Sequence, residues 1–501
     1  SIVHNPDEST WELGVHIADV SEFVAAGSSL DQEAAQRGNS VYLPRHVIPM
    51  LPEVLSNGIC SLQADTDRLT RSVFIKLNEK GHVVGQRVSA SVIRSRKRLT
   101  YLEAQSLIDG DIEEAIKNTN VNSEYESELI DALRGANTLA KIIRKRRLRD
   151  GMIVLDLPEV DLVFDDDGRV EGVHPEDGAF THTIIEMFMV EANEALSRTF
   201  YELGIPVMRR IHPDPSGGDM SELQEIARMI GLRMPEEPGR KDLQRLLKAT
   251  AGTPAARAIH ISVLRTLTKA TYSPAIIGHY ALASGHYSHF TSPIRRYPDL
   301  LLHRAMTAYL DATENGTKPP KKRDERSFAS RLRQDKRVLN EAELVAFGRR
   351  CSESEVEAEA AERQLRQFLV LDFLAREHLG DEFEGIITGF GRGAVYISLD
   401  DFLVEGMASL TEIPGGDGRK EFWRSVGKGM RIVGGRSSRC LVRGDQLKVQ
   451  IERVDPASRT MSLRVVSLPD GEARYDRGET ATKKKKSGKN KSRRKRTKRG
   501  R

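Results

Sequence analysis

Two adjacent arginines stand in the stretch of this sequence that is richest in side chains able to do chemistry. The stretch His286–Arg304 reads HYSHFTSPIRRYPDLLLHR, and it combines aromatic, hydroxyl and basic side chains with two prolines. The guanidinium groups of Arg295 and Arg296 can each meet a phosphate through two parallel hydrogen bonds. One interpretation is therefore a phosphate-binding site, and the other is a basic surface turn before an amphipathic helix.

The prolines determine the structure that we expect around these arginines. Pro298 in the middle of a helix would remove a backbone hydrogen bond, so the helix should begin near this residue. The sequence therefore predicts a tight turn over Thr291–Tyr297 and a helix from about Pro298 to Asp311. Such a turn would hold both arginines on a constrained backbone.

The segment TSPIRRYPDLLLHR resembles the signature of the ribonuclease II and ribonuclease R family of 3'-to-5' exoribonucleases. Three further segments resemble the same family in the same order: WELGVHIADVSEFV at Trp11–Val24, RGNSVYLPRHVIPMLPEVLSNGICSL at Arg37–Leu62, and RLTYLEAQ at Arg98–Gln105. Four collinear motifs favour the functional interpretation of the arginine stretch. The chain is identified as a member of this family, most similar to its ribonuclease R branch.

The resemblance implies an activity and a cofactor, Mg²⁺. Two Mg²⁺ ions held by carboxylates can make a nucleophile from water and neutralise charge on a phosphate. Family members hold these ions with four aspartates just before the segment that begins here at Trp11. That place precedes Ser1, so no metal ligand is assigned within this chain. We expect the sequence to be an N-terminally truncated piece of a longer protein.

The resemblance also implies roles for individual residues. Arg295 would stabilise charge on the scissile phosphate, and Arg296 is the weaker RNA-binding candidate of the pair. Tyr42 resembles the aromatic residue that stacks on the 3'-terminal base. Tyr101 and Glu186 resemble residues near the terminal nucleotide, where contacts to the 2'-hydroxyl separate RNA from DNA; Glu186 joins Arg295 as a catalytic candidate. Without the resemblance, both tyrosines would more often be packing residues.

Helical periodicity predicts two helices in the first half of the chain. Thr181–Gly204 is an amphipathic segment that carries Glu186. Ser123–Leu148 is the other, and it leads into the basic run KIIRKRRLRDG. A solvated helix face and an RNA contact are equally good interpretations of that run.

One turn signal and one capping signal predict further elements. Asp165–Asp167 precede a glycine between apolar runs, so they indicate a hairpin turn in a strand pair over Met152–Val173 rather than a metal site. Ser352 with Glu355 resembles a capping box, which predicts the start of a long helix that runs to about Leu379.

The segment from Asp381 to about Ser467 predicts a small barrel. Five short strands joined by glycine turns are typical of the OB type, and the segment resembles an S1-type RNA-binding domain. Such barrels stack bases on aromatic side chains. Phe390 is the main stacking candidate, and Tyr396, Phe422 and Trp423 are weaker ones. The alternative is that these aromatics fill the barrel, and it is stronger for Tyr396 than for Phe390.

Composition excludes several classes of protein. No run of 18 or more apolar residues is present and Ser1–Thr10 is polar, so we expect a soluble, cytoplasmic protein with no membrane contact. Three cysteines, Cys60, Cys351 and Cys440, lie far apart, which argues against a disulfide framework or a zinc site.

The net charge of +5 conceals an asymmetry. Lys483–Arg501 has 13 Lys or Arg and no acidic residue, whereas the rest of the chain has 64 basic against 72 acidic residues. Residues 468–501 lack apolar periodicity, so we expect a disordered basic tail. The tail is predicted to bind RNA phosphates, and a solubilising or ribosome-associating segment is the alternative.

The predicted fold class is α+β with three parts. A large mixed RNB-type catalytic domain covers 1–380, a five-stranded OB-type barrel covers 381–467, and the tail covers 468–501. The predicted function is that of a ribonuclease R-like enzyme, which hydrolyses RNA processively from single-stranded 3' ends to 5'-mononucleotides in RNA turnover. The alternative is a non-catalytic RNA-binding protein that lacks the metal-binding aspartates.

Deletion of Lys483–Arg501 should flatten the dependence of RNA affinity on salt. Each single-strand phosphate that the tail neutralises adds about −0.7 to the slope of log affinity against log salt. Fluorescence anisotropy with a labelled RNA at several salt concentrations measures this slope. Equal slopes for the full and shortened chains would show that the tail does not touch RNA.

Overall fold

The computed structural model describes residues 1–119, 124–215, 220–229, 231–253, 256–391, 393–415, 419, 421–426 and 431–468. The chain divides into two compact units: unit 1 is Ser1–Ala251 with Ile259–Val370, and unit 2 is Gly252–Ala258 with Leu371–Arg501. The sequence predicts a domain boundary near residue 380, and the chain passes from unit 1 to unit 2 at Leu371. The predicted basic tail, from residue 469 onward, lies outside the described residues.

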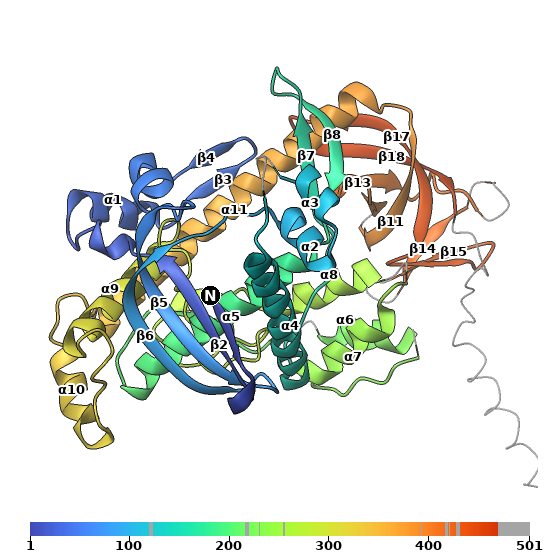
Figure 1. The fold of residues 1–501 in the computed structure, drawn as a ribbon. Coiled ribbons are helices and arrows are strands. Elements are labelled where there is room, and N and C mark those ends of the chain that lie inside the picture. The colour runs from blue at the N-terminus through green and yellow to red at the C-terminus, as the bar shows by residue number, and fades with distance from the viewer. Residues whose placement is uncertain are drawn as a thin grey trace, which may run out of the picture. The chain divides into compact units, whose positions relative to one another are not determined.

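An antiparallel four-stranded sheet forms the centre of unit 1. Its order is β1 (Ile2–Asn5), β2 (Thr10–Ala18), β5 (Asp67–Asn78) and β6 (Val83–Arg94). Successive strand residues point to opposite faces, so alternate apolar residues such as Leu13 and Val15 enter the same core. The helix α5 (Phe180–Glu202) packs against β2 and β5 (Figure 1). The predicted helix over Thr181–Gly204 is thus confirmed.

One backbone position on the β6 edge of this sheet is covered by a side chain. Asn315 accepts a hydrogen bond from the Ala90 N–H at 2.6 Å and donates one to the Ala90 carbonyl at 3.0 Å. Its amide therefore takes the place of a neighbouring strand on β6. Gly316 follows with a φ of +78°, where a Cβ would lie 2.4 Å from the Val88 carbonyl oxygen, so glycine is required.

Further helices and strands complete unit 1. They are α1 (Ser29–Arg37), β3 (Val41–Leu43), β4 (His46–Ile48), α2 (Tyr101–Asp109), α3 (Ile112–Lys117), α4 (Ser127–Asp150), β7 (Val160–Phe164), β8 (Val170–Pro175), β9 (Arg209–Ile211), α6 (Met220–Met229), α7 (Arg240–Thr250), β10 (Thr271–Ser273), α9 (Tyr297–Ala312) and α10 (Glu325–Leu332). The helices α8 (Ala256–Thr266) and α11 (Glu341–Glu377) contribute residues to both units.

The Asp-Gly signal gives the predicted hairpin. The Asp165 N–H donates to the Arg169 carbonyl at 2.9 Å, and the turn joins β7 to β8. The strand pair is shorter than predicted, because β7 begins only at Val160. The basic helix α4 ends at Gly151, whose φ of +106° suits a glycine cap.

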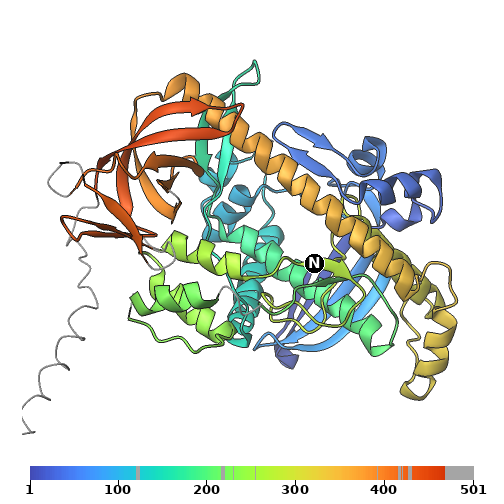
Figure 2. The ribbon, with the colours of Figure 1, turned by 180° about the vertical axis from the view of Figure 1, so that it is seen from behind.

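The predicted start of the long helix is wrong. α11, the long orange helix in Figure 2, begins at Glu341, and Asn340 and Glu343 exchange the hydrogen bonds of a capping box there. Ser352 lies inside the helix and donates its hydroxyl proton to the Gly348 carbonyl at 2.7 Å. A serine hydroxyl can donate a hydrogen bond to a carbonyl on the preceding turn of a helix, so the Ser352 and Glu355 pattern did not mark the start of this helix.

Unit 2 contains the predicted five-stranded barrel. The closed barrel has the order β11 (Glu382–Phe390), β12 (Ala394–Leu399), β13 (Val404–Ser409), β18 (Thr460–Ser467) and β17 (Gln446–Asp455). A separate three-stranded sheet, not predicted, comprises β14 (Trp423–Val426), β15 (Arg431–Gly434) and β16 (Cys440–Val442). Together with the mixed unit 1, this confirms the α+β class.

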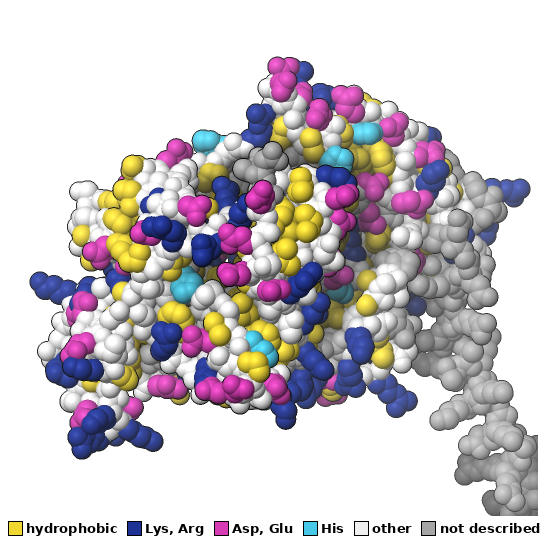
Figure 3. All heavy atoms as spheres, in the orientation of Figure 1, with side chains coloured by type: hydrophobic (Ala, Val, Ile, Leu, Met, Phe, Trp, Pro, Cys, Tyr) yellow, Lys and Arg dark blue, Asp and Glu magenta, His cyan; other side chains and the backbone are white. Residues whose placement is uncertain are grey.

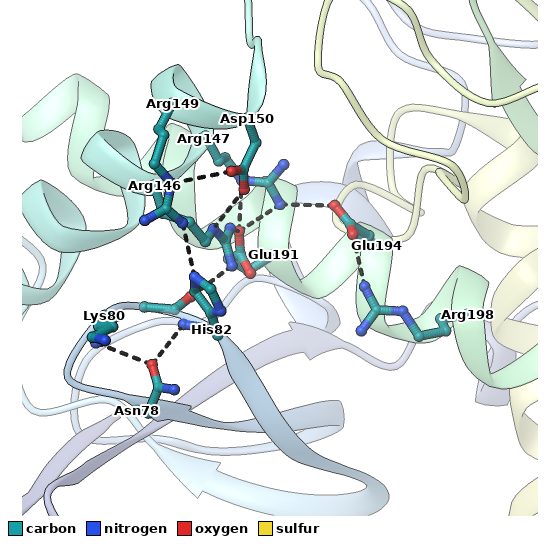
Figure 4. A network of polar contacts seen from close by, with 11 residues as sticks. Asn78, Lys80, His82, Arg146, Arg147, Arg149, Asp150, Glu191, Glu194 and Arg198 are labelled. Atoms are coloured by element: carbon teal, nitrogen blue, oxygen red, sulfur yellow. Dashed lines mark hydrogen bonds and ion pairs between the residues drawn. The ribbon is translucent and has the colours of Figure 1, made fainter.

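Two arginines of the basic run at the end of α4 take part in a buried ion network with α5 (Figure 4). Arg147 donates from Nε to Glu191 at 2.6 Å and from Nη2 to Glu194 at 2.9 Å. Arg146 also pairs with Glu191, and Arg198 pairs with Glu194 at 2.7 Å. The Glu191 and Arg147 side chains are almost fully buried. Arg146 and Arg147 therefore stabilise the fold through their pairs with Glu191.

The network also changes the acidity of its members. Burial raises the pKa of Glu194, but the Arg147 guanidinium outweighs it and holds that pKa below its usual value. A carboxylate with a lowered pKa stabilises the fold above its unfolded pKa, and this stabilisation is lost as the pH falls through the folded pKa. We therefore expect this contribution in full at neutral pH.

Glu191→Ala should lower the free energy of unfolding by about 3–5 kcal/mol, because it leaves two buried guanidinium groups without their shared carboxylate. Glu202→Ala, on an exposed position of the same helix, is the matched control and should change it by less than about 0.5 kcal/mol. Urea denaturation at pH 7 compares the variants. Equal effects would show that the network does not stabilise α5.

No helix in the described part of the chain is long and apolar enough to cross a membrane. On the face shown in Figure 3, Lys and Arg side chains are interspersed with Asp and Glu.

Candidate active site

The turn before α9 has the form that the prolines predict. The Ser292 carbonyl accepts hydrogen bonds from the backbone N–H groups of Arg295 and Arg296, at 3.2 and 3.0 Å. α9 begins at Tyr297, and Pro298 occupies its first turn, where a missing N–H breaks no helical bond.

The carboxylate of Asp299 closes this turn from the helix side. Asp299 is fully buried, and its Oδ1 accepts hydrogen bonds from the Ser292 N–H at 2.8 Å and from Arg296 Nη2 at 2.7 Å. Burial lowers the pKa of Arg296, but the Asp299 charge more than offsets this and the pKa lies above its usual value. This ion pair favours a role for Arg296 in holding the turn, while RNA binding by Arg296 stays a prediction.

Arg295 and Tyr42, two of the predicted site residues, lie side by side. The Arg295 side chain is exposed, and its Cζ lies 5.9 Å from the centre of the Tyr42 ring. Backbone hydrogen bonds join the two segments: the Ser40 N–H donates to the Arg295 carbonyl at 3.0 Å, and the Tyr297 N–H donates to the Gly38 carbonyl at 2.9 Å. The β3–β4 hairpin is therefore attached directly to the arginine turn.

The hairpin presents Tyr42 among exposed apolar side chains. Tyr42 is 43% exposed, and Val47, its partner across the hairpin, and Ile48 are exposed as well. Hydrophobic side chains are visible over β3 and β4 in Figure 3. An aromatic ring and a nearby guanidinium can together receive a base and an adjoining phosphate.

Tyr101 and Glu186 form a second group. Tyr101 is the first residue of α2, and its ring stacks on His182 with centroids 3.8 Å apart and planes at 27°. His182 and Glu186 lie one turn apart on α5. Desolvation raises the pKa of the Glu186 carboxyl, and Arg144 and Arg147 act against this shift.

A cavity of about 930 Å³ opens beside Tyr101. Its lining includes the basic segment 96–98 and the acidic residues Asp65 and Asp177. The volume is at the upper end of the range for ligand pockets. Among the described residues, no hydrogen bond, ion pair or ring contact joins Tyr101 or Glu186 to Arg295 or Tyr42, so the predicted residues form two groups.

Buried polar side chains hold the irregular segment that leads into the turn. Asn193 of α5 accepts the Phe290 N–H at 2.8 Å and donates to the Tyr287 hydroxyl oxygen at 3.1 Å. The Tyr272 hydroxyl and His289 Nδ1 are 2.9 Å apart. Burial lowers the pKa of His289 well below its usual value, so this imidazole is neutral at pH 7. The arginine turn thus follows a segment that is fixed to α5.

The aromatic candidates of the barrel have different environments. Phe390, at the end of β11, is half-buried, and Tyr396 on β12 and Phe422 are exposed. Trp423 is buried and donates its indole N–H to the Ile413 carbonyl at 3.1 Å, so it belongs to the core and is not available for stacking. Phe390 stays the main candidate.

Sequence reasoning missed Asp299 and His182. An aspartate three residues after Arg296 in the first turn of a predicted helix is a detectable signal, because side chains at that spacing are neighbours. His182 stands four residues before Glu186, but its partner Tyr101 is 81 positions away, and no local pattern links the two.

The described residues do not supply a metal site. They contain no group of three or more His, Cys, Asp or Glu side chains that could hold a metal ion. The Mg²⁺ that the resemblance implies therefore has no ligand set among the described residues.

The RNB domain, a protein-family model, matches residues 1–312. The chain belongs to this family. Ribonuclease R of Escherichia coli (strain K12) is 32% identical over 483 residues, which is 95% of this chain and 56% of that protein. The chain thus spans about half the length of the curated relatives it matches.

Solved structures show the same fold. RNase R of Mycoplasma genitalium, in complex with ribose-methylated single-stranded RNA, superposes with a TM-score of 0.79 at 26% identity, over 93% of this chain and 68% of that one. Yeast Ssd1, described as a pseudonuclease, superposes with a TM-score of 0.64 at 18% identity, over 86% and 49% of the two chains. The likeness to Ssd1 concerns the fold alone.

Asp299→Asn should loosen the arginine turn, because a neutral amide holds the Arg296 guanidinium less strongly than a carboxylate does. We expect amide hydrogen exchange at Arg295 and Arg296 to become about tenfold faster or more, the range for loss of a charged hydrogen bond. Hydrogen exchange followed by mass spectrometry measures this effect. Asp311→Asn, which changes an exposed aspartate of the same helix, is the control and should leave both amides unchanged.

Proposed function

We propose that this chain is the RNA-binding and phosphate-contacting part of a ribonuclease R-like 3'-to-5' exoribonuclease. The complete enzyme would hydrolyse RNA processively from single-stranded 3' ends to 5'-mononucleotides, in cytoplasmic RNA turnover. One observation carries the proposal: the exposed Arg295 guanidinium lies beside the exposed Tyr42 ring, on two segments joined by backbone hydrogen bonds.

This arrangement suits the binding of a nucleic acid without recognition of its base sequence. A guanidinium binds phosphate in every nucleotide, and an aromatic ring stacks on every base. The RNA bound in the Mycoplasma genitalium RNase R structure supports RNA as the ligand, and the ribonuclease R relatives support exonuclease activity.

Each predicted residue has a proposed role. Arg295 would stabilise charge that develops on the scissile phosphate, and Tyr42 would stack on the terminal base. Tyr101 and Glu186 would lie near the terminal ribose, where the 2'-hydroxyl distinguishes RNA from DNA. Arg296 would keep Arg295 in place through Asp299. In unit 2, an S1-type role of the barrel would rest on Phe390 as a stacking platform.

Mg²⁺ enters the proposal as an ion whose ligands lie outside the described residues. We propose that they are the four aspartates expected upstream of Ser1. The alternative function, a non-catalytic RNA-binding protein, shares the Arg295 and Tyr42 surface and differs in hydrolysis alone.

Arg295→Ala, in a longer form of the protein that carries the aspartates, should lower the rate of cleavage about 10²–10³-fold, the usual effect of removing one donor to a developing negative charge. RNA affinity should change far less, because a group that acts on the transition state contributes to rate more than to binding. Single-turnover cleavage of a labelled RNA and fluorescence anisotropy measure the two effects.

Arg94→Ala removes a well-exposed arginine of β6 and is the control, with little expected change in rate. Equal losses of rate and affinity in Arg295→Ala would contradict the assigned role. A longer form that binds RNA but releases no mononucleotides would favour the non-catalytic alternative.

A further inference from the structure

Two consecutive arginines of β9 have opposite environments. Successive strand residues point to opposite sides. Arg210 pairs with Glu355 at 2.5 Å and lies over the Tyr272 ring, 4.5 Å from its centre. Arg209 is 3% exposed and donates one side-chain hydrogen bond, from Nη1 to the Ser197 hydroxyl oxygen at 2.8 Å. Arg210 therefore has an anionic partner, and Arg209 needs one.

No carboxylate pairs with Arg209 in the part of the chain that the structure describes. Burial lowers the pKa of this guanidinium, and among the described residues Tyr201 acts in the opposite direction. An arginine nevertheless keeps its charge in proteins. A buried cation without a partner destabilises a fold, so its presence points to an anion that comes from outside the chain.

The surroundings of Arg209 have the features of a phosphate site beside an aromatic surface. The Arg209 Cζ lies 5.9 Å from the centre of the Tyr201 ring, which stacks on His286 with centroids 3.8 Å apart. His286 Nδ1 is buried and has no hydrogen-bond partner among the described residues. Tyr201 is 43% exposed, so the aromatic part of this group lies at the surface.

One further cation, Arg198, influences His286. Burial lowers the pKa of His286, and the positive charges of Arg209 and Arg198 lower it further. Arg198 is itself held by Glu194 at 2.7 Å, which fixes a second guanidinium near the imidazole. The Glu194 carboxylate acts on the His286 pKa in the opposite direction, so Arg209 is the cation here without a carboxylate partner among the described residues. The neutral imidazole can still donate a hydrogen bond from Nδ1.

We propose that Arg209, His286 and Tyr201 form a binding site for a phosphate group, either free phosphate or the phosphate of a nucleoside 5'-monophosphate. The Arg209 guanidinium supplies parallel N–H donors, His286 Nδ1 supplies another, and the exposed Tyr201 ring supplies a surface for a base. This site goes beyond the proposed function, because it uses neither Arg295 nor Tyr42 and needs no RNA cleavage.

Isothermal titration calorimetry of the 501-residue chain with sodium phosphate, against sodium chloride at the same ionic strength, tests the site. We expect saturable phosphate binding that becomes at least about tenfold weaker in Arg209→Gln, since a charge-assisted hydrogen bond is lost. His286→Ala should weaken binding in the same direction. Absence of saturable binding, or equal affinity in the wild-type chain and both variants, would overturn the proposal.

A second titration with adenosine 5'-monophosphate identifies the source of the phosphate. Tighter binding than free phosphate, reduced to the affinity of phosphate by Tyr201→Leu, would support a nucleotide as the ligand. Equal affinities for the two probes, both dependent on Arg209, would support free phosphate.

Two controls separate this site from structural effects and from the candidate active site. Arg210→Gln should lower the melting temperature and keep phosphate affinity, whereas Arg209→Gln should not lower the melting temperature in phosphate-free buffer, because it removes an unpaired buried charge. Phosphate binding that is lost in Arg295→Ala and retained in Arg209→Gln would place the anion at the arginine turn and overturn the proposal.

Discussion

The buried carboxylate of Asp299 is the interaction on which the candidate active site depends. Its Oδ1 holds both the backbone of Ser292 and the side chain of Arg296, so it fixes the two ends of the turn from the first turn of α9. α9 itself is anchored by Asp31 of α1, which accepts hydrogen bonds from Tyr297 and Arg304. A site that rests on a buried helix keeps its geometry better than one carried by a free loop.

Features governed by local chemistry could be predicted from the sequence. Pro298 located the start of α9, because the proline ring cannot continue a helix from before it. The Asp-Gly pair gave the β7–β8 hairpin. The closed barrel of unit 2 followed from its strand alternation and glycine turns. The nearness of Arg295 and Tyr42 did not follow from any local pattern, because the hydrogen bonds that join them connect residues more than 250 positions apart.

Two of the features that sequence reasoning missed, the role of the α4 basic run and the lack of a carboxylate beside Arg209, depend on contacts between distant segments. The basic run of α4 could not be assigned to solvent or RNA, because Glu191 and Glu194, which bind Arg146 and Arg147, lie about 45 positions later. The capping signal at Ser352 was misleading for a local reason. A serine is tolerated inside a helix because its hydroxyl can donate a hydrogen bond to a carbonyl on the preceding turn, as Ser352 does. The sequence likewise cannot show that Arg209 lacks a carboxylate partner, because its neighbour Arg210 is also an arginine and does pair with Glu355.

The side-chain amide of Asn315 has a consequence for how the chain behaves among copies of itself. An uncovered edge strand offers unpaired N–H and C=O groups to any other strand, which is a common route to intermolecular β-pairing. Asn315 occupies both groups of Ala90 near the middle of β6. A second molecule cannot extend the sheet past this point without displacing the amide. One side chain therefore obstructs the addition of a strand from another molecule at Ala90 of this edge.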